Sequence, residues 1–254
     1  MQIDGAEFDY IVVGAGSAGS VIAARLSARP DVRVLLVEAG GKDNSFWLKI
    51  PVGYGHTIVD PKVNWKYMTE PNSALGGRQI YWPRGKTLGG SSSINGLIYI
   101  RGQAQDYDQW RQLGNEGWSY EDVLPFFRLS EDQENGEDDY HGIGGPLSVT
   151  NLVERNPLCD ALIASAGANG IPHNPDFNGA EQEGVGYYQA TIRNGRRCST
   201  SVAYLNPAKR RPNLTILTET LAERILFDGA RATGIRLWRD GESFTVKSRR
   251  EVSL

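Results

Sequence analysis

The sequence predicts an α/β fold that begins with a Rossmann-like, dinucleotide-binding βαβ unit. Two short apolar runs, at 9–13 and 32–37, have the composition of buried parallel strands. Between them, residues 17–28 place apolar side chains at helical spacing, and Pro30 ends that pattern. The first run leads directly into the glycine-rich turn GAGSAG at 14–19. Strand, turn, helix and second strand therefore follow one another at the spacing of a dinucleotide-binding unit.

The residues of this turn have separate predicted roles. Gly14 permits the tight turn, Gly16 lets a pyrophosphate approach the backbone, and Gly19 lets helix and strand pack closely. Free N–H groups at the start of the helix would hold the phosphates. Glu38, after the second strand, can accept hydrogen bonds from both ribose hydroxyls and would repel a 2′-phosphate, which argues against NADP. The alternative is a glycine-rich turn in another kind of α/β protein, and the unit alone does not choose between NAD and FAD.

A second glycine-rich stretch, RGKTLGGSSSINGLIYIRG, occupies residues 84–102. Its simplest interpretation is a long glycine-serine loop. A linker would lack the apolar set formed by Ile94, Leu97, Ile98 and Ile100. We therefore expect a loop that delivers a buried helix or an extended segment across the cofactor, with glycines where the main chain approaches it.

Three other stretches carry weaker signals. Residues 40–61 are loop-like, and they are too irregular for an element to be assigned. Trp65 and Tyr67 follow, and their simplest interpretation is as core aromatics. Residues 131–139 (EDQENGEDD) are expected to form an acidic, solvated loop, with a metal site as the alternative.

From residue 144 the pattern becomes β-like. GGPLSVTN and GVGYYQATI alternate polar and apolar residues and flank an expected helix at 157–170. RCSTSVAYL at 197–205 is expected to be a helix or a turn. Strand-like runs separated largely by Asp-Gly turns follow at 213–218, 222–227, 232–238 and 243–247, and all four are expected to form an antiparallel meander.

Composition excludes several classes of function. The chain has 254 residues, of which 40% are hydrophobic and 22% are charged, and its formal net charge is -3. This balance gives no electrostatic reason to expect nucleic acid or an anionic membrane as a partner. No apolar run is long enough to span a membrane, and residues 1–10 do not resemble a secretory signal. The chain has only two cysteines, Cys159 and Cys198, and they are far apart in sequence. This usage favours a reducing compartment, so we expect a cytoplasmic protein.

The 84–102 stretch resembles the flavin-site signature of the glucose-methanol-choline (GMC) family of flavin oxidoreductases, and of its choline-dehydrogenase-like branch in particular. DYDQW at 106–110 and NEGWSYEDVLPFF at 115–127 continue the resemblance, as do GGPLSV and RCSTSVAYL, so it covers nearly the whole chain. It implies a Rossmann-like FAD-binding domain, made of the βαβ unit and an antiparallel meander, with part of a second, α+β substrate domain. The implied divisions are 1–143 (with a lid-like loop at about 43–75), 144–210 for the substrate domain, and 211–254 for the return to the FAD-binding domain.

The resemblance also implies a set of cofactor-binding positions. Those for the pyrophosphate and adenosine half are Gly14, Gly16, Ser17, Ala18, Gly19, Glu38, Ala39 and Ala222. Those near the pyrophosphate, the ribityl chain and the isoalloxazine are Trp65, Arg84, Leu88, Gly89, Gly90, Ser93, Asn95, Gly96, Leu97 and Ile98. Some members attach FAD covalently through a His immediately before the Asn. Because Ile94 stands there, we expect non-covalent FAD.

The implied activity is oxidation of a small-molecule alcohol, with hydride transfer to flavin N5; the electron acceptor is not predicted. The catalytic His of the family lies in a carboxyl-terminal half that we expect to be outside this chain, which ends at Leu254. His56, His141 and His173 do not match that position, and we expect surface or loop locations for them. No catalytic residue is assigned, and the isolated chain is expected to bind FAD weakly or to need a complementing carboxyl-terminal half.

Three interpretations of function stay open at this point. The first is the FAD-binding part of an alcohol dehydrogenase or oxidase, either as a fragment or as one chain of a split enzyme. The second is a non-catalytic flavin-binding or interaction module. The third is an NAD-dependent dehydrogenase, for which the second glycine-rich stretch is unnecessary.

Overall fold

A computed structural model describes residues 3–254 of the protein. The chain forms two compact units, one made of the residues up to Gly96 and from Arg196 onward, the other of Leu97–Gly195. These limits differ from the domain divisions expected at 143 and 210. The two units are defined by which residues contact one another and not by what they do. The division into an FAD-binding domain and a substrate domain therefore stays a prediction.

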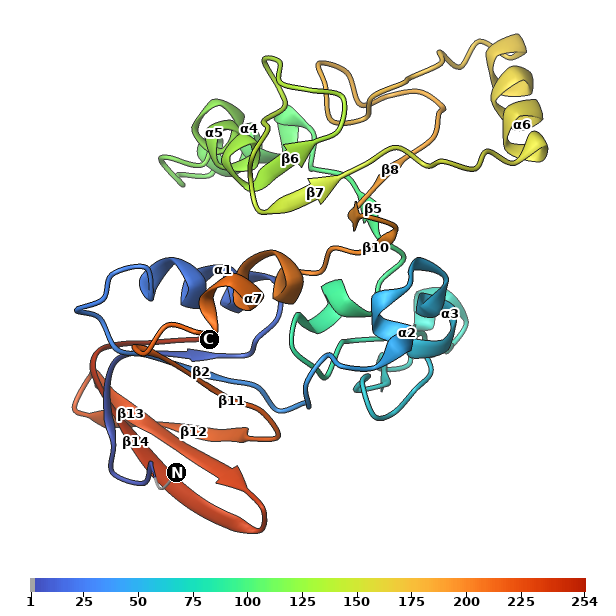
Figure 1. Ribbon diagram of the computed structural model, residues 1–254. Coiled ribbons are helices and arrows are strands. Elements are labelled where there is room, and N and C mark those ends of the chain that lie inside the picture. Colours follow the sequence, from blue (N-terminus) through green and yellow to red (C-terminus); the bar gives the residue numbers. More distant parts are fainter. Residues whose placement is uncertain (1–2) are drawn as a thin grey trace. The chain divides into compact units, whose positions relative to one another are not determined.

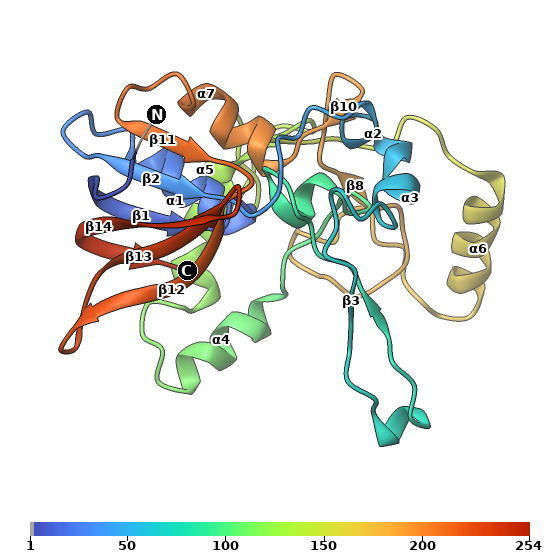
Figure 2. The same ribbon diagram turned by 90° about the horizontal axis from the view of Figure 1, so that it is seen from below.

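The first unit is built on a six-stranded mixed sheet with the order β11-β2-β1-β14-β13-β12. Figure 2 shows these strands side by side in that order. The four strands from β11 to β14 are parallel to their neighbours, whereas β14, β13 and β12 form an antiparallel meander. The strands are β1 (Glu7–Val13), β2 (Val34–Val37), β11 (Leu214–Leu217), β12 (Leu221–Asp228), β13 (Arg231–Arg239) and β14 (Glu242–Ser253). The predicted fold class, a βαβ unit with an antiparallel meander, is confirmed.

Burial explains why the βαβ unit was visible in the sequence. All four residues of β2 are buried, as expected for a strand covered on both faces. Helix α1 (Ser17–Leu26) packs on β1 and β2, and the π-helix η4 (Ser201–Leu205) with α7 (Asn206–Ala208) packs beside α1 (Figure 1). A hydrophobic cluster joins the parallel strands to the meander; its fully or nearly fully buried members include Ile11, Leu35, Val37, Ile235, Leu237 and Val246.

One strand was assigned to the wrong part of the sheet. The run at 213–218 was expected in the antiparallel meander, but β11 pairs in parallel with β2. Asn213 supports this pairing, because its side-chain amide donates to the carbonyls of Ser27, Arg29 and Val32. These three bonds anchor the start of β11 beside the loop that leads into β2.

The stretch at 40–61 is more ordered than expected from its composition. It contains α2 (Phe46–Lys49), the 3₁₀ turn η1 (Pro51–Gly53) and α3 (Tyr54–Thr57). Gly53 permits this compact arrangement, since a Cβ there would lie 1.9 Å from the Trp47 carbonyl oxygen. A two-stranded hairpin follows, β3 (Tyr67–Met68) with β4 (Tyr81–Trp82), and Figure 2 shows it extending outward with η2 (Ser73–Leu75) at its tip.

The second unit consists of short strands and three helices. Strand β5 (Ile98–Tyr99) pairs with β8 (Gln189–Ala190), and β6 (Glu131–Gln133) pairs in parallel with β7 (Leu147–Val149). The helices are α4 (Ala104–Gln112), α5 (Tyr120–Ser130) and α6 (Pro157–Ala168), and α6 has no buried residue. The remaining short strands are β9 (Ile192–Arg193) in this unit and β10 (Arg196–Arg197) in the first.

One expectation for the second unit was wrong, and another was right only in part. Glu131, expected in a solvated loop, is fully buried and bonds to Arg101 at 2.6 Å. His141, expected at the surface or in a loop, lies in a loop but is buried, with Nδ1 3.1 Å from the Glu131 carboxylate and Nε2 3.0 Å from Asp176 Oδ2. The two carboxylates raise the pKa of His141 to about 9, against the opposing effect of burial. Charged residues are buried here because they are paired.

Candidate dinucleotide site

A cavity of about 520 Å³ lies at the carboxyl ends of β1 and β2 in the first unit. Ligands of open α/β sheets bind at this edge. The cavity is bounded by the first glycine-rich turn, the end of β2, the second glycine-rich stretch and the start of β12. Its lining residues are Val13, Gly14, Gly16, Ser17, Val37, Glu38, Ala39, Trp65, Tyr67, Arg84, Gly85, Gly90, Ser91, Thr220, Leu221 and Ala222.

The first turn contains three glycines that differ in what surrounds them. Gly14 has φ +89° and its N–H donates to the Val37 carbonyl, so it makes the turn between β1 and α1. A Cβ on Gly19 would lie 1.9 Å from the Gly14 carbonyl oxygen, which confirms that Gly19 permits close helix-strand packing. A Cβ on Gly16 would meet no protein atom within 4 Å. Because Gly16 lines the cavity, the space in front of it is open to a ligand.

Glu38 is buried at the edge of the cavity and its carboxylate organises the surrounding backbone. Oε2 accepts the Ala15 N–H and Oε1 accepts the Gly40 N–H, each at 2.8 Å. Burial raises the pKa of Glu38, while the two backbone hydrogen bonds and the charge of Lys86 oppose that shift. Each oxygen retains acceptor capacity, because a carboxylate oxygen offers about two lone-pair sites. The ribose role predicted for Glu38 stays a prediction, and its role in holding the first turn was not foreseen.

The two glycine-rich segments meet backbone to backbone. A Cβ on Gly90 would lie 2.7 Å from Gly16 Cα, and the φ of Gly90 is +53°. The Gly89 N–H donates to the Ala15 carbonyl at 2.7 Å. Gly85 in turn has no room for a side chain, because a Cβ would lie 2.1 Å from the Gly90 carbonyl. Because Gly85, Gly89 and Gly90 lack side chains, the backbone of the second stretch packs directly against the first turn and forms one side of the cavity.

A third segment, residues 197–201, fastens the second stretch from behind. Ser92 Oγ accepts the Thr200 N–H at 3.0 Å and lies 2.9 Å from Thr200 Oγ1. Arg197 donates through Nη1 to the Ser92 carbonyl and to Asn95 Oδ1. A helix or a turn was expected at 197–205, and the RCSTSVAYL motif was part of the family resemblance, but these contacts with the second stretch were not foreseen. The signal for them was an arginine and polar residues next to the small apolar run VAYL, which is unusual for a solvent-exposed turn.

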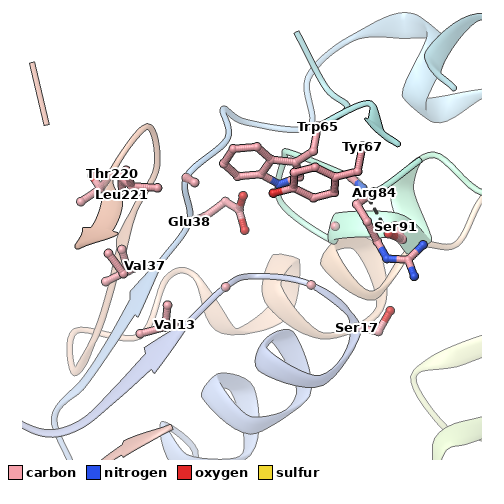
Figure 3. A pocket seen from close by; sticks show the side chains of 16 residues that line it. Val13, Ser17, Val37, Glu38, Trp65, Tyr67, Arg84, Ser91, Thr220 and Leu221 are labelled. Atoms are coloured by element: carbon pink, nitrogen blue, oxygen red, sulfur yellow. Dashed lines mark hydrogen bonds between the residues drawn. The ribbon is translucent and has the colours of Figure 1, made fainter. Parts of the chain in front are cut away.

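Aromatic side chains form one wall of the cavity. The rings of Trp65 and Tyr67 are stacked, with centroids 5.8 Å apart and planes 7° apart, and Lys86 Nζ lies 4.5 Å from the centre of the Trp65 ring. Figure 3 shows both rings on one side of the cavity, Glu38 pointing toward them, and Ser17 on the opposite side. Neither aromatic residue is buried, which contradicts their interpretation as core aromatics.

The predicted cofactor-binding residues fall into three groups. Nine line the cavity: Gly14, Gly16, Ser17, Glu38, Ala39, Trp65, Arg84, Gly90 and Ala222. Seven belong to the first unit but do not line it: Ala18, Gly19, Leu88, Gly89, Ser93, Asn95 and Gly96. Leu97, which is buried with φ +66°, and the exposed Ile98 belong to the second unit.

Three further observations bear on the chemistry available. None of the residues that line the cavity is a histidine. Within residues 3–254, no cluster of three or more His, Cys, Asp or Glu has the arrangement needed for a metal ion. In the same part of the chain, no helix combines the length and the apolar character needed to cross a membrane. The fold and the cavity define a Rossmann-like protein with a candidate dinucleotide site.

The sequence profile of the GMC oxidoreductases matches residues 8–254, so the chain belongs to that family. Mouse mitochondrial choline dehydrogenase is 44% identical over 98% of this chain and 43% of its own length. Pyridoxine 4-oxidase from "Mesorbium loti" has 34% identity and a TM-score of 0.92 over 96% of this chain and 48% of its own. An FAD-dependent oxidoreductase from Chaetomium thermophilum has 27% identity and a TM-score of 0.88, over 96% and 44%.

This chain therefore spans less than half the length of these relatives and corresponds to the amino-terminal portion of a GMC protein. The resemblance found in the 84–102 stretch is confirmed. FAD is the cofactor of the family, which removes the reason for the NAD-dependent interpretation.

Proposed function

We propose that this chain binds FAD non-covalently and forms the FAD-binding part of an oxidoreductase that acts on the CH–OH group of a small alcohol. The observation that carries the proposal is the cavity in which Gly16 and Gly90 meet. The open space in front of Gly16, beside the start of α1, fits a pyrophosphate held by backbone N–H groups. The Trp65–Tyr67 wall and the second glycine-rich stretch fit the flavin half.

The chain's own residues would bind and orient the cofactor. Ser17 and the N–H groups that follow Gly16 would hold the pyrophosphate, and Glu38 would accept from the ribose. Residues 88–96, here called the flavin-side segment, would lie against the ribityl chain and the ring. FAD, when bound, supplies a hydride acceptor at flavin N5. Choline is the first alcohol to test, because the mouse relative is a choline dehydrogenase.

A second candidate function is a flavin-binding module without chemistry of its own. It is favoured by the lack of a histidine among the cavity-lining residues. A carboxyl-terminal half that supplies a His would convert this module into one chain of a split enzyme. The cytoplasmic location inferred from the sequence also stays a prediction.

The test is a visible absorption spectrum of the purified chain, with added FAD, before and after acid precipitation. We expect a flavin spectrum that moves to the supernatant on acidification, because the buried Ile94 offers no attachment point. Flavin kept in the precipitate would contradict non-covalent binding. A chain that takes up no FAD would contradict the proposed function.

Two further experiments distinguish the candidate functions and test where the flavin half of FAD binds. Choline should bleach the flavin only when a family carboxyl-terminal half is present; no bleaching by any tested alcohol in its presence would favour the non-catalytic module. Asn95→Trp should weaken FAD binding and leave ADP binding unchanged, because ADP lacks the flavin. Unchanged FAD affinity in that variant would refute our placement of the flavin-side segment.

A further inference from the structure

Arg197 is a buried cation in the first unit, and part of its donor capacity is unused. The residue is only 2% exposed. Nη1 donates to the Ser92 carbonyl at 3.2 Å and to Asn95 Oδ1 at 2.8 Å. Nε and Nη2 have no hydrogen-bond partner within residues 3–254. Buried N–H groups are rarely left in this state, so these two require an explanation.

The charge of Arg197 is also uncompensated. Within the described part of the chain, no carboxylate forms an ion pair with it, whereas the buried Arg101 of the second unit is paired with Glu131. Desolvation lowers the pKa of Arg197 to about 10, so the guanidinium is still charged at neutral pH. A buried charge without a counter-charge is costly to the fold, so its presence here calls for a functional explanation.

The position of Arg197 indicates what that function is. Ser91 lines the cavity, and the carbonyl of the next residue, Ser92, accepts a hydrogen bond from Arg197. The guanidinium therefore contacts the flavin-side segment one residue away from a residue that lines the cavity. It is held there by a main-chain oxygen and by the Asn95 amide oxygen, two acceptors that fix its position.

We propose that Arg197 is the buried cation that stabilises the negative charge which hydride transfer places on the bound cofactor. A hydride carries two electrons and one proton, and it therefore adds one negative charge to its acceptor. In a region of low dielectric constant, an unpaired cation in contact with the flavin-side segment favours that added charge more strongly than an exposed cation would. This inference rests on the proposed function, since it requires FAD in the cavity.

The inference distinguishes two ways in which a cation can act on FAD. A cation that serves the pyrophosphate stabilises oxidised and reduced FAD equally, because the phosphates carry the same charge in both forms. A cation that serves the ring stabilises the reduced form more. The ratio of the two affinities, measured as the reduction potential of bound FAD, separates these cases.

The experiment compares Arg197→Met, Arg197→Lys and wild type, each loaded with FAD, alone or with a complementing carboxyl-terminal half. Arg211→Met is the matched control, because Arg211 Nη1 also donates to a main-chain carbonyl (Ala24) and a side-chain oxygen (Ser27 Oγ). Those partners lie at the carboxyl-terminal end of α1, whereas the cavity is at its amino-terminal end. The reduction potential is measured by equilibration with a reference dye, and ADP binding reports on the adenosine half.

We expect Arg197→Met to reduce the affinity ratio of reduced to oxidised FAD about tenfold, a potential lower by about 30 mV. Arg197→Lys and Arg211→Met should stay near the wild-type potential, and ADP binding should be unchanged in all three. An unchanged potential in Arg197→Met, or equal weakening of both redox forms, would overturn the inference. If Arg197→Met does not fold, Arg197→Gln, which keeps a donor without the charge, makes the same comparison. A wild-type chain that binds no FAD would refute the proposed function itself.

Discussion

Alanine substitutions at Gly16 and Gly19 of the first turn should have different effects: one should mainly reduce ligand binding, and the other should mainly reduce stability. A Cβ on Gly16 meets no protein atom within 4 Å, whereas a Cβ on Gly19 would lie 1.9 Å from the Gly14 carbonyl oxygen. Both glycines have backbone angles that alanine can adopt. The two substitutions add the same methyl group, so a difference between them reports only on what surrounds it.

The structure gives the size of each effect. For Gly19→Ala, helix and turn must separate by more than about 1 Å, and overpacking of this kind costs about 1–3 kcal/mol. The obstacle is a backbone carbonyl rather than a flexible side chain, which places the cost near the upper end. The helix propensity of alanine over glycine returns up to about 1 kcal/mol. The expected net loss in the free energy of unfolding is about 2 kcal/mol.

For Gly16→Ala we expect a small loss of stability and a large loss of ligand affinity. Alanine is a poorer N-cap residue than glycine, which costs about 1 kcal/mol or less. The new methyl group would occupy the space in front of the turn, so ADP and FAD affinity should both fall about tenfold or more. Gly55→Ala is the matched control, because a Cβ there also meets no protein atom within 4 Å and Gly55 does not line the cavity.

Urea unfolding followed by fluorescence measures the stability of the three variants, and titration calorimetry with ADP measures binding. The reasoning would be refuted if Gly19→Ala were as stable as wild type. It would equally be refuted if Gly16→Ala bound ADP with wild-type affinity, since the open space would then not be the pyrophosphate site.

Two further predictions concern the buried charges of the second unit. Arg101→Met should cost about 3–5 kcal/mol, because it leaves the Glu131 carboxylate buried without its cation. The control Arg29→Met should leave stability close to that of the wild type, because the Arg29–Asp31 pair is exposed to solvent. Urea unfolding compares the two variants, and equal losses would contradict the pairing. The raised pKa of His141, about 9, gives stability that is fully present below its unfolded pKa near 6.5 and is lost as pH rises through about 9. His141→Gln should remove that pH dependence, and an unaltered profile would argue against the contacts of His141 with Glu131 and Asp176.

The parts of the fold that local sequence determines were predicted well. β1, the turn after it, α1 and β2 follow one another within a short stretch, and their periodicity is a direct consequence of burial. The strands of the meander were also predicted from their periodicity. β11 was misplaced because it pairs with β2 and is held by contacts that are distant in sequence, among them the hydrogen bonds from Asn213 to carbonyls more than 180 residues away. No local pattern carries that information.

The candidate site shows the same division. Glycines that must admit a ligand or a second backbone were identified from the motif, since the requirement lies in the residue itself. Trp65 was placed near the cofactor by the family resemblance alone, because Trp65 and Tyr67 have the composition of a core and only the fold shows that neither is buried. Glu38 was assigned to the ligand alone, although its two oxygens also hold the N–H groups of Ala15 and Gly40.

Buried charge was the least visible property. Glu131 stands in an acidic run that local reasoning assigns to solvent, and His141 follows that run closely, yet Arg101, 30 residues before Glu131, pairs with this carboxylate in the interior. Arg197 presents the opposite case, because it is buried without such a partner. Pairing offsets the desolvation cost of a buried charge, whereas an unpaired buried charge leaves that cost uncompensated. The contrast between these two arginines is therefore the physical reason to look for the counter-charge of Arg197 in what the cavity binds.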